Sequence, residues 1–335
     1  PNPVDVVALP RNEQEIEAVL EWCSNSGHTA IPYGAGSSVV GGIEPPQDSP
    51  AAVSIDISAL DRVLEVDDVS RSARIQGGVL GPAMEDQLRP KGFTLRHFPQ
   101  SFEFSTLGGW IATRSGGHYA TNQTHIDDFV ESVRMLTPAG VWESRRLPGS
   151  GAGPSPDRLP IGSEGILGII TEAWMRIQAR PVFRASAGVV FPSFQAAAEA
   201  ARHIVQAKLW PANCRVLDPG EAGSAAGLDG QRSLLVLGFE SGEVPQGDMV
   251  RAAIAIARDG GGIIEEDDIK IVDSSGASGG VAGRQGAVGN WRDSFVNAPY
   301  TRNSTMGLGV VAETLETAIT WDRWTNLDAA VREAL

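Results

Sequence analysis

The stretch Pro32-Tyr33-Gly34-Ala35-Gly36-Ser37-Ser38 places a loop of small residues directly after a predicted strand over residues 29–33. A short apolar strand and an amphipathic helix over residues 13–26 come before it. The helix is predicted from Asn12 as N-cap, from apolar residues at helical spacing, and from Gly27 as its end. The order is therefore strand, helix, strand and glycine loop.

The glycines of this loop let several backbone N–H groups converge without obstruction by side chains, which is a geometry that binds a pyrophosphate. No lysine follows, so the loop is not a Walker A motif, and the third glycine of a Rossmann fingerprint is missing. On this loop alone, a glycine-rich hairpin without a ligand is the alternative.

Two further segments have a similar composition. Residues 100–110 combine hydroxyl side chains with the pair Gly108-Gly109, which permits close approach of a flat ligand to the main chain. Residues 162–168 place three glycines before a predicted buried strand over residues 169–177. Three such segments in one half of the chain predict a single extended ligand lying along the backbone. An adenine dinucleotide fits that description.

Short elements are predicted between these segments. Strands are expected at residues 6–8, 52–57, 63–66, 73–75, 130–136 and 141–143, with a helix at 82–88. Near Arg180-Pro181 the pattern changes to alternating strands and helices, with strands at 188–191 and 233–238 and helices at 194–209 and 248–258. We therefore place a domain boundary there, which gives domains over residues 1–179 and 180–335.

The last part of the chain is less regular. Residues 273–290 are rich in glycine and serine and are predicted to form a mobile loop. A strand over residues 308–320 and the start of a helix over residues 327–335 are expected after it. The chain then stops without a closing strand.

Composition excludes several classes of function. The 335 residues carry a formal net charge of −14, which argues against a nucleic-acid partner or an anionic membrane surface. Two cysteines cannot supply a four-ligand zinc site, the acidic run at residues 265–268 is expected to be solvated, and no metal is predicted. No apolar run reaches about 18 residues, so no transmembrane segment is expected. The composition favours a bacterial cytoplasmic protein, and a homodimer is left open.

In chain order, the three segments at residues 32–38, 104–110 and 162–173 resemble the FAD-binding domain of the vanillyl-alcohol oxidase and p-cresol methylhydroxylase superfamily. Within that superfamily, Glu103-Phe104-Ser105-Thr106, Thr113-Arg114 and the late block at residues 313–323 are most similar to the alkyldihydroxyacetonephosphate synthases. The resemblance spans nearly the whole chain.

This resemblance implies an α+β fold. A two-subdomain FAD-binding domain of the p-cresol methylhydroxylase (PCMH) type would occupy residues 1–179, and an α/β, ferredoxin-like cap domain would occupy residues 180–335 and be incomplete at its C-terminus. The chain also looks truncated at its start, which lacks methionine.

The resemblance further implies which residues contact FAD. They are Pro32, Tyr33, Gly34, Ala35, Gly36, Ser37, Ser38, Gln100, Ser101, Phe102, Glu103, Phe104, Ser105, Thr106, Gly108, Gly109, Thr113, Arg114, Ser115, Gly116, Gly162, Ser163, Glu164, Gly165, Ile166, Leu167 and Gly168. Such contacts come mainly from backbone amides and hydroxyls, so an acidic protein can still bind an anionic dinucleotide.

We expect the FAD to be bound non-covalently. The string Arg114-Ser115-Gly116-Gly117-His118 looks like the one that carries covalent flavin in berberine-bridge-type relatives. In those relatives, however, the string is the glycine loop itself. The matching position here is Ser37, which cannot form the histidyl bond.

For the synthase family, the resemblance implies exchange of an acyl for an alkyl group on dihydroxyacetone phosphate, a small lipid-like substrate. Arg302 matches a family arginine that contacts substrate, and its guanidinium suits a phosphate or a carboxylate. The family's catalytic tyrosine and histidine-rich loop would follow residue 335, so no catalytic acid or base is assigned. The alternatives are an FAD-dependent D-2-hydroxyacid (lactate or glycolate) dehydrogenase and a non-catalytic scaffold that kept the fold.

Overall fold

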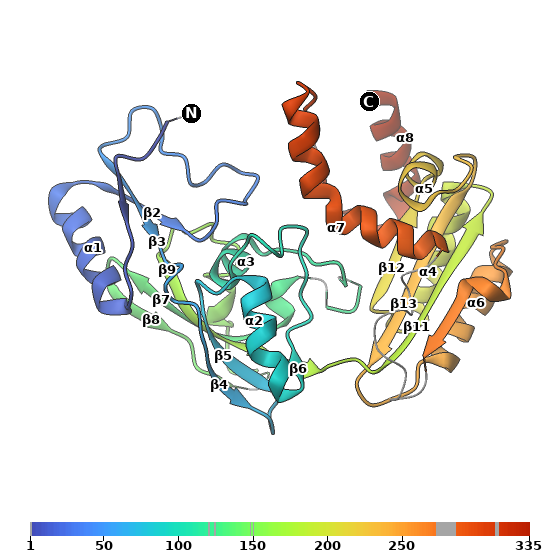
Figure 1. Cartoon of the computed structure of the whole chain (residues 1–335), viewed down its shortest axis with the longest axis horizontal. Coiled ribbons are helices and arrows are strands. Elements are labelled where there is room, and N and C mark those ends of the chain that lie inside the picture. The colour runs from blue at the N-terminus through green and yellow to red at the C-terminus, as the bar shows by residue number, and fades with distance from the viewer. Residues whose placement is uncertain are drawn as a thin grey trace. The chain divides into compact units, whose positions relative to one another are not determined.

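The computed structural model describes residues 2–119, 121–123, 125–147, 149, 151–272, 286–311 and 315–335. They form two compact units, Pro1–Arg180 and Pro181–Leu335, each with its own sheets and apolar core (Figure 1). We call them the N-terminal unit and the C-terminal unit. Both mix helices with strands, which confirms the predicted α+β class.

The N-terminal unit begins with a three-stranded parallel sheet. Its strands, in spatial order, are β1 (Val6–Ala8), β3 (Ala52–Asp56) and β2 (Thr29–Tyr33), and α1 (Glu13–Ser26) connects β1 to β2. The ends of α1 lie where the sequence predicts them. The Asn12 side chain accepts a hydrogen bond from the Glu15 backbone N–H at 2.9 Å, and Gly27 ends the helix with a φ of 70°.

A five-stranded antiparallel sheet is the larger part of this unit. Its spatial order is β4 (Val63–Asp67), β5 (Ser72–Gln76), β9 (Ile169–Arg176), β7 (Val130–Thr137) and β8 (Gly140–Glu143). α2 (Gly81–Leu88) and α3 (Leu107–Thr113) pack on it and bury Met84, Leu107 and Trp110 in a common core. β6 (Phe93–Thr94) pairs separately with β10 (Gln178–Ala179).

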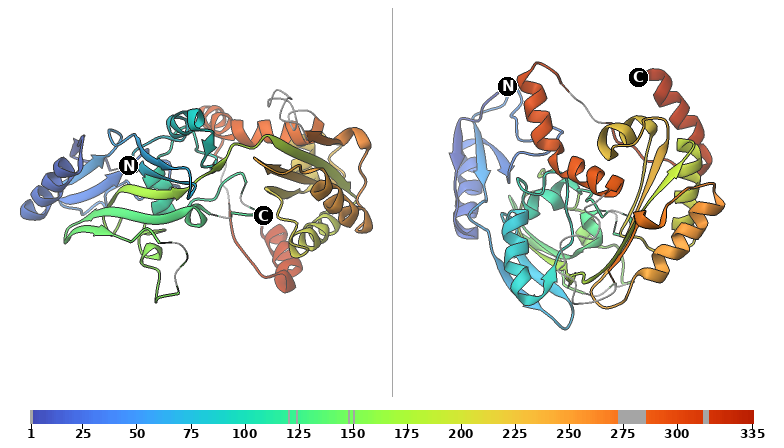
Figure 2. Two further views of the ribbon diagram at one scale, coloured as in Figure 1. Left: turned by 90° about the horizontal axis from the view of Figure 1, so that it is seen from below. Right: turned by 45° about the vertical axis from the view of Figure 1, so that its right-hand side comes forward.

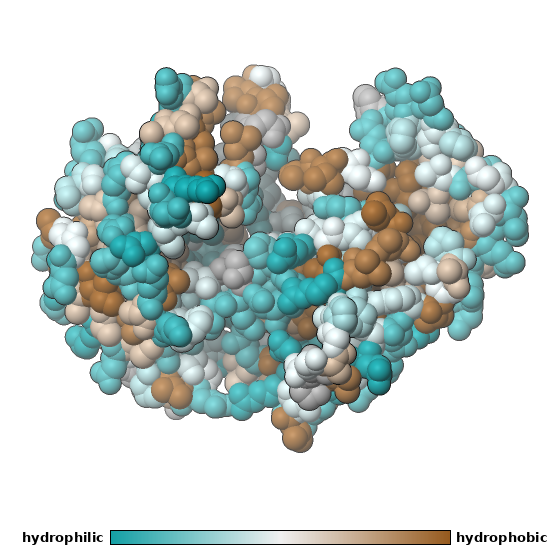
Figure 3. All heavy atoms as spheres, turned by 180° about the vertical axis from the view of Figure 1, so that it is seen from behind, coloured by the Kyte–Doolittle hydropathy of each residue, from teal (hydrophilic) through white to brown (hydrophobic). Residues whose placement is uncertain are grey.

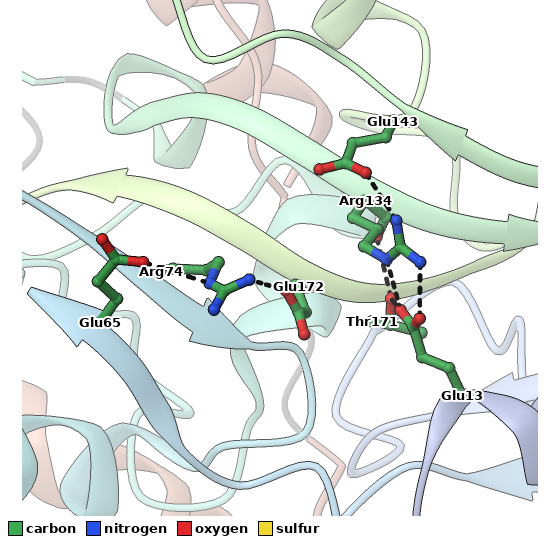
Figure 4. A network of polar contacts seen from close by, with 7 residues as sticks. All are labelled: Glu13, Glu65, Arg74, Arg134, Glu143, Thr171 and Glu172. Carbon is green, nitrogen blue, oxygen red and sulfur yellow. Dashed lines mark hydrogen bonds and ion pairs between the residues drawn. The ribbon is translucent and has the colours of Figure 1, made fainter.

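A row of alternating charges crosses the five strands of this sheet (Figure 4). In strand order the row is Glu65, Arg74, Glu172, Arg134 and Glu143. Glu13, from the first turn of α1, accepts two hydrogen bonds of 2.8 Å from Arg134 and one of 2.5 Å from Thr171. The row therefore ties α1, and the small sheet that α1 covers, to the larger sheet.

The C-terminal unit is built on a four-stranded antiparallel sheet. Its order is β12 (Asn213–Leu217), β13 (Ser233–Ser241), β11 (Phe183–Phe191) and β14 (Ile269–Val272). Its helices are α4 (Phe194–Gln206), α5 (Pro219–Ala226), α6 (Gly247–Asp259), α7 (Gly286–Gly307) and α8 (Trp324–Ala334). α4 and α6 pack on one face, while α5 and α7 pack on the other (Figures 1 and 2). This strand order, with α4 and α6 as the crossovers, confirms the ferredoxin-like cap.

Two predictions for the last part of the chain are wrong where the structure describes it. The strand predicted over residues 308–320 is absent from residues 308–311 and 315–320, which the structure describes. Instead, α7 continues to Gly307, and the next glycine, Gly309, has a φ of 78° and turns the chain away. Residues 286–290, predicted as loop, are the first turn of α7. The rest of that predicted loop lies outside the described residues.

The surface is mixed in polarity. In the face drawn in Figure 3, hydrophilic atoms alternate with separate hydrophobic patches. Within the parts of the chain that the structure describes, no helix has both the length and the apolar character needed to cross a membrane.

Candidate functional site

The three segments that the sequence singles out lie together in the N-terminal unit. A Cβ built on Gly34 would be 2.3 Å from Thr106 Oγ1, so the glycine loop touches the start of α3. A Cβ built on Gly165 would be 3.2 Å from Pro32 Cγ, and a hydrogen bond of 3.4 Å joins Ser38 Oγ to Glu164. The glycine loop therefore contacts both of the other segments.

The segment before α3 is held by hydrogen bonds of its own. Thr106 is the N-cap of α3, and its hydroxyl oxygen accepts a hydrogen bond from the Gly109 N–H at 3.3 Å. The Ser105 hydroxyl accepts a hydrogen bond from the indole N–H of Trp110 at 2.6 Å and donates one to the Ser101 carbonyl at 2.7 Å. The Ser105 hydroxyl is thus engaged within the protein, and it fixes the turn that leads into the helix.

The third segment docks on the C-terminal end of α3. The N–H of Gly162 donates to the Ile111 carbonyl at 3.0 Å, and the N–H of Glu164 donates to the Ala112 carbonyl at 2.8 Å. Gly162, Glu164 and Gly165 all have positive φ values, of 81°, 52° and 83°. The backbone of residues 162–168 therefore turns repeatedly, and three of its seven residues are glycine.

Sequence reasoning missed the pair Gly77-Gly78, where backbone segments approach closely and where Gly77 meets the start of α3. The N–H of Gly108 donates to the Gly77 carbonyl at 2.7 Å. A Cβ on Gly77 would be 2.2 Å from the Ile170 carbonyl oxygen, and one on Gly78 would be 1.9 Å from that of Ile57. Only glycine fits at these positions. A Gly-Gly pair directly after a predicted strand was the available signal.

Sequence reasoning also missed His97, which is buried next to the predicted segments. Its Nε2 lies 2.8 Å from the Ser115 hydroxyl, and its ring contacts Trp110 and Phe129 edge-on. Burial, and to a lesser degree the nearby His125, lowers the pKa of His97 to about 3. A neutral imidazole therefore contacts Ser115. A single histidine in a sequence does not indicate that its ring will be buried, neutral and in contact with a serine.

Arg114 closes α3 at its C-terminus with a φ of 54°. Its guanidinium lies 3.2 Å from the Asp127 carboxylate, which Arg158 also contacts. Burial raises the pKa of Asp127, but the hydrogen bonds and charges of the two arginines outweigh burial and leave this pKa below its ordinary value. The ion pairs fix the segment that contains Thr113, Ser115 and Gly116.

The remaining predicted residues have more varied surroundings. Gly36 has a φ of 64° and packs against Tyr33, whereas Phe104 and Ile166 are exposed. Arg302 lies on α7 in the C-terminal unit and is exposed. All the predicted FAD contacts, in contrast, belong to the N-terminal unit. Their roles as FAD ligands, and the role of Arg302, stay predictions.

Comparison with known proteins gives matches over both units. The family model described as an FAD binding domain matches residues 4–144, and that of the FAD linked oxidases, C-terminal domain, matches residues 180–335. The chain belongs to the FAD-linked oxidase family. The two domain matches indicate FAD as its cofactor.

Individual relatives of this chain include alkyldihydroxyacetonephosphate synthases. That of Dictyostelium discoideum is 42% identical over 220 residues, covering 66% of this chain and 36% of the relative. That of Caenorhabditis elegans is 30% identical over 344 residues, covering 99% of this chain and 57% of the relative. A solved structure of such a synthase superposes with a TM-score of 0.81 at 30% identity, covering 98% of this chain and 62% of that one.

A shorter match is to the glycolate oxidase subunit GlcD of Bacillus subtilis, 30% identical over 216 residues and covering 64% of this chain and 45% of the relative. The chain thus spans between about a third and three fifths of the length of the relatives it matches.

The residues present fit FAD as the cofactor. Gly34 and Gly36 carry no side chains of their own, so the backbone N–H groups of the glycine loop can converge on a pyrophosphate. The buried Ser163 hydroxyl has no hydrogen-bond partner among the described residues, so it has the capacity to bind a ligand. These donors are neutral, which suits a dinucleotide in an acidic protein.

Proposed function

We propose that this chain forms the FAD-binding and cap parts of an enzyme of the alkyldihydroxyacetonephosphate synthase type. The match to the synthases extends through both units at 30% identity, and this is the observation that supports the proposal. In it, residues 1–179 bind FAD and residues 180–335 form the cap domain.

The proposed reaction exchanges one oxygen substituent for another on dihydroxyacetone phosphate. The bond between the substrate carbon and the ester oxygen breaks, and the fatty acid leaves as a carboxylate that keeps the bonding electrons. A fatty alcohol forms the new ether bond and releases its proton. FAD, when bound, would supply the electrophilic chemistry, and no net oxidation occurs.

In this proposal the protein residues bind and orient. The segments at residues 32–38, 100–109, 113–116 and 162–168 hold FAD through backbone amides and hydroxyls. Arg302 pairs with the substrate phosphate through its guanidinium. The substrate is a small, lipid-like molecule. A homodimer and a cytoplasmic location are further parts of the proposal that rest on the sequence alone.

The decisive experiment loads the purified chain with FAD and supplies an acyl dihydroxyacetone phosphate with a radiolabelled fatty alcohol. The expected product is labelled ether, formed without an electron acceptor. A flavin-loaded chain that gives no labelled ether even when the residues expected to follow position 335 are supplied with it would contradict the proposal. A chain with no flavin absorbance near about 450 nm would instead support the non-catalytic alternative.

The FAD is proposed to be non-covalent, because Ser37 stands where covalent relatives have histidine. Acid precipitation of the loaded protein should release all the yellow colour into the supernatant. Colour that stays with the pellet would show a covalent bond and refute this part.

A second candidate function is oxidation of a D-2-hydroxyacid, which the match to a glycolate oxidase subunit favours. That function predicts bleaching of the flavin by D-lactate or glycolate in the absence of oxygen, whereas the synthase function predicts no bleaching. The two candidates share the same FAD site.

A further inference from the structure

The candidate FAD site is built from two sheets of the N-terminal unit. The glycine loop follows β2 of the small parallel sheet, whereas residues 162–168 lead directly into β9 of the large sheet. Residues 100–109 enter α3, which packs on the large sheet. The close approach of Gly34 to Thr106 therefore crosses from one sheet to the other. The separation of the two sheets decides whether backbone groups from both can contact one dinucleotide.

Glu13 lies at the edge of the small sheet from which the glycine loop leaves. β1 and β2 both run parallel to β3, and α1 connects β1 to β2. In such a unit the helix runs back along the sheet, so its first turn lies at the edge where both strands end. Glu13 is in the first turn of α1, and β2 ends at Tyr33, next to the loop. The Glu13 carboxylate and the loop therefore share one edge.

From this edge the Glu13 carboxylate reaches the large sheet (Figure 4). It accepts two hydrogen bonds of 2.8 Å from Arg134 on β7 and one of 2.5 Å from the Thr171 hydroxyl on β9. Thr171 is three residues after Gly168, where the third segment ends. Its backbone carbonyl accepts the N–H of Gly77 at 2.7 Å, beside the start of α3. We call Glu13, Arg134 and Thr171 the polar latch.

The polar latch accompanies an apolar contact between the same layers. Ile16 of α1 and Ile55 of β3 pack in one cluster with Leu136 of β7 and Ile169 of β9. Apolar packing is non-directional, so it holds the layers together without fixing their exact position. The two parallel hydrogen bonds from a guanidinium to a carboxylate fix both a distance and an orientation. The latch therefore supplies the directional part of the contact.

We propose that Glu13 and Arg134 are positioning residues that hold the two sheets at the separation FAD requires. The inference rests on the proposed assignment of the FAD contacts to these segments, and not on the reaction. Glu13 acts through α1 and the small sheet, and Arg134 acts through β7 of the large sheet. Loss of the latch leaves the apolar contact in place, so the chain should still fold but bind FAD less tightly.

The test measures the dissociation constant of FAD for the full chain by flavin fluorescence, at a temperature below the melting temperature of every variant. Glu13→Gln should weaken FAD binding by about 5- to 50-fold, and Arg134→Met by at least as much. Arg134→Lys keeps the charge but lacks the planar pair of N–H groups, so its affinity should lie between those of Arg134→Met and the wild type.

Two control variants separate positioning from charge and from stability. Glu143 also pairs with Arg134, at 2.6 Å, but lies on β8 within the large sheet, so Glu143→Gln should bind FAD like the wild type. Leu88 is fully buried at the end of α2. Leu88→Ala should lower the melting temperature of the FAD-free chain at least as much as Glu13→Gln does, and leave FAD affinity unchanged.

The inference is overturned if Glu13→Gln binds FAD as tightly as Glu143→Gln, or if Leu88→Ala weakens binding as much as Glu13→Gln. A wild-type chain that binds no FAD would overturn the proposed cofactor site together with this inference. A wild-type chain that binds FAD but forms no labelled ether would count against the proposed reaction alone, and the comparison of variants would still decide the role of the latch.

Discussion

Gly34 has no room for a side chain, because Thr106 is both buried and engaged as the cap of α3. We expect Gly34→Ala to push the glycine loop away from α3 or to break the cap. Either change should lower the free energy of unfolding by about 1–3 kcal/mol and weaken FAD binding about 10-fold or more. Quenching of FAD fluorescence and denaturant unfolding measure the two effects.

Gly42→Ala is the matched control in the same loop. A Cβ there would have its nearest neighbour 3.9 Å away, which is ordinary contact, and its φ is not in the left-handed region. This variant should bind FAD like the wild type. Equal affinities for Gly34→Ala and Gly42→Ala would show that the contact with Thr106 does not shape the site.

His97 should make stability depend on pH. Its pKa is about 3 in the folded protein, against an ordinary value near 6.5, because the charged imidazole is disfavoured by burial. The unfolded chain therefore binds the proton first, so stability should fall as pH drops from about 6.5 towards 3, by at most about 1.4 kcal/mol per pH unit.

The measurement compares unfolding at several pH values for the wild type and His97→Gln, whose amide can still bond Ser115. The variant should show a shallower loss of stability over this range. Its control, His203→Gln, changes an exposed histidine of the C-terminal unit that pairs with Glu199, and a change of the same size in both variants would not be specific to the burial of His97. An imidazole NMR signal of His97 that titrates near pH 6.5 would refute the assignment.

At the scale of residues, the sequence predicted that three backbone segments lie together, but not which of their atoms are in contact. Gly34 and Thr106 are 72 positions apart, and nothing local to either residue encodes the 2.3 Å approach. Gly77, Gly78 and His97 were missed because their roles come from tertiary neighbours. The sequence singled out a segment only where several small residues cluster, as in residues 34–38.

At the scale of elements, Glu13 attaches α1 to the large sheet. The hydrogen bonds from Arg134 are the main reason that the pKa of Glu13 lies below its ordinary value. Glu13→Gln should lower the free energy of unfolding by about 1–2 kcal/mol at neutral pH. Because a lowered carboxylate pKa stabilises above the unfolded value, the difference from wild type should shrink as pH falls below about 4.

Glu15→Gln is the internal control, since Glu15 lies in the same first turn but pairs with the exposed Arg11. It should change stability little. Thermal or denaturant unfolding of both variants gives the comparison. If Glu15→Gln proves as damaging as Glu13→Gln, the loss comes from the helix terminus and not from the tie to the sheet.

Element boundaries were predictable where the chain itself marks them. Asn12 and Gly27 bracket α1, whereas α4, which was predicted to reach residue 209, ends at Gln206. The wrong strand at residues 308–320 arose from apolar residues such as Leu308, Val310 and Val311, which are exposed and form no strand. A strand requires a neighbour for its hydrogen bonds, and sequence periodicity does not supply one.

At the scale of the whole molecule, FAD should stabilise one unit and not the other. Each unit has its own core, so calorimetry should resolve two unfolding transitions. All the predicted FAD contacts belong to the N-terminal unit, and a ligand at 100 times its dissociation constant adds about 2.7 kcal/mol to the state that binds it. This should raise one melting temperature by about 5–10 °C and leave the other in place.

Two variants assign the transitions to the units. Glu13→Gln labels the N-terminal transition and Leu237→Ala the C-terminal one, since each side chain lies within one unit. A single transition would contradict the independent unfolding of the two units, and an equal rise of both melting temperatures would contradict the assignment of FAD binding to residues 1–179.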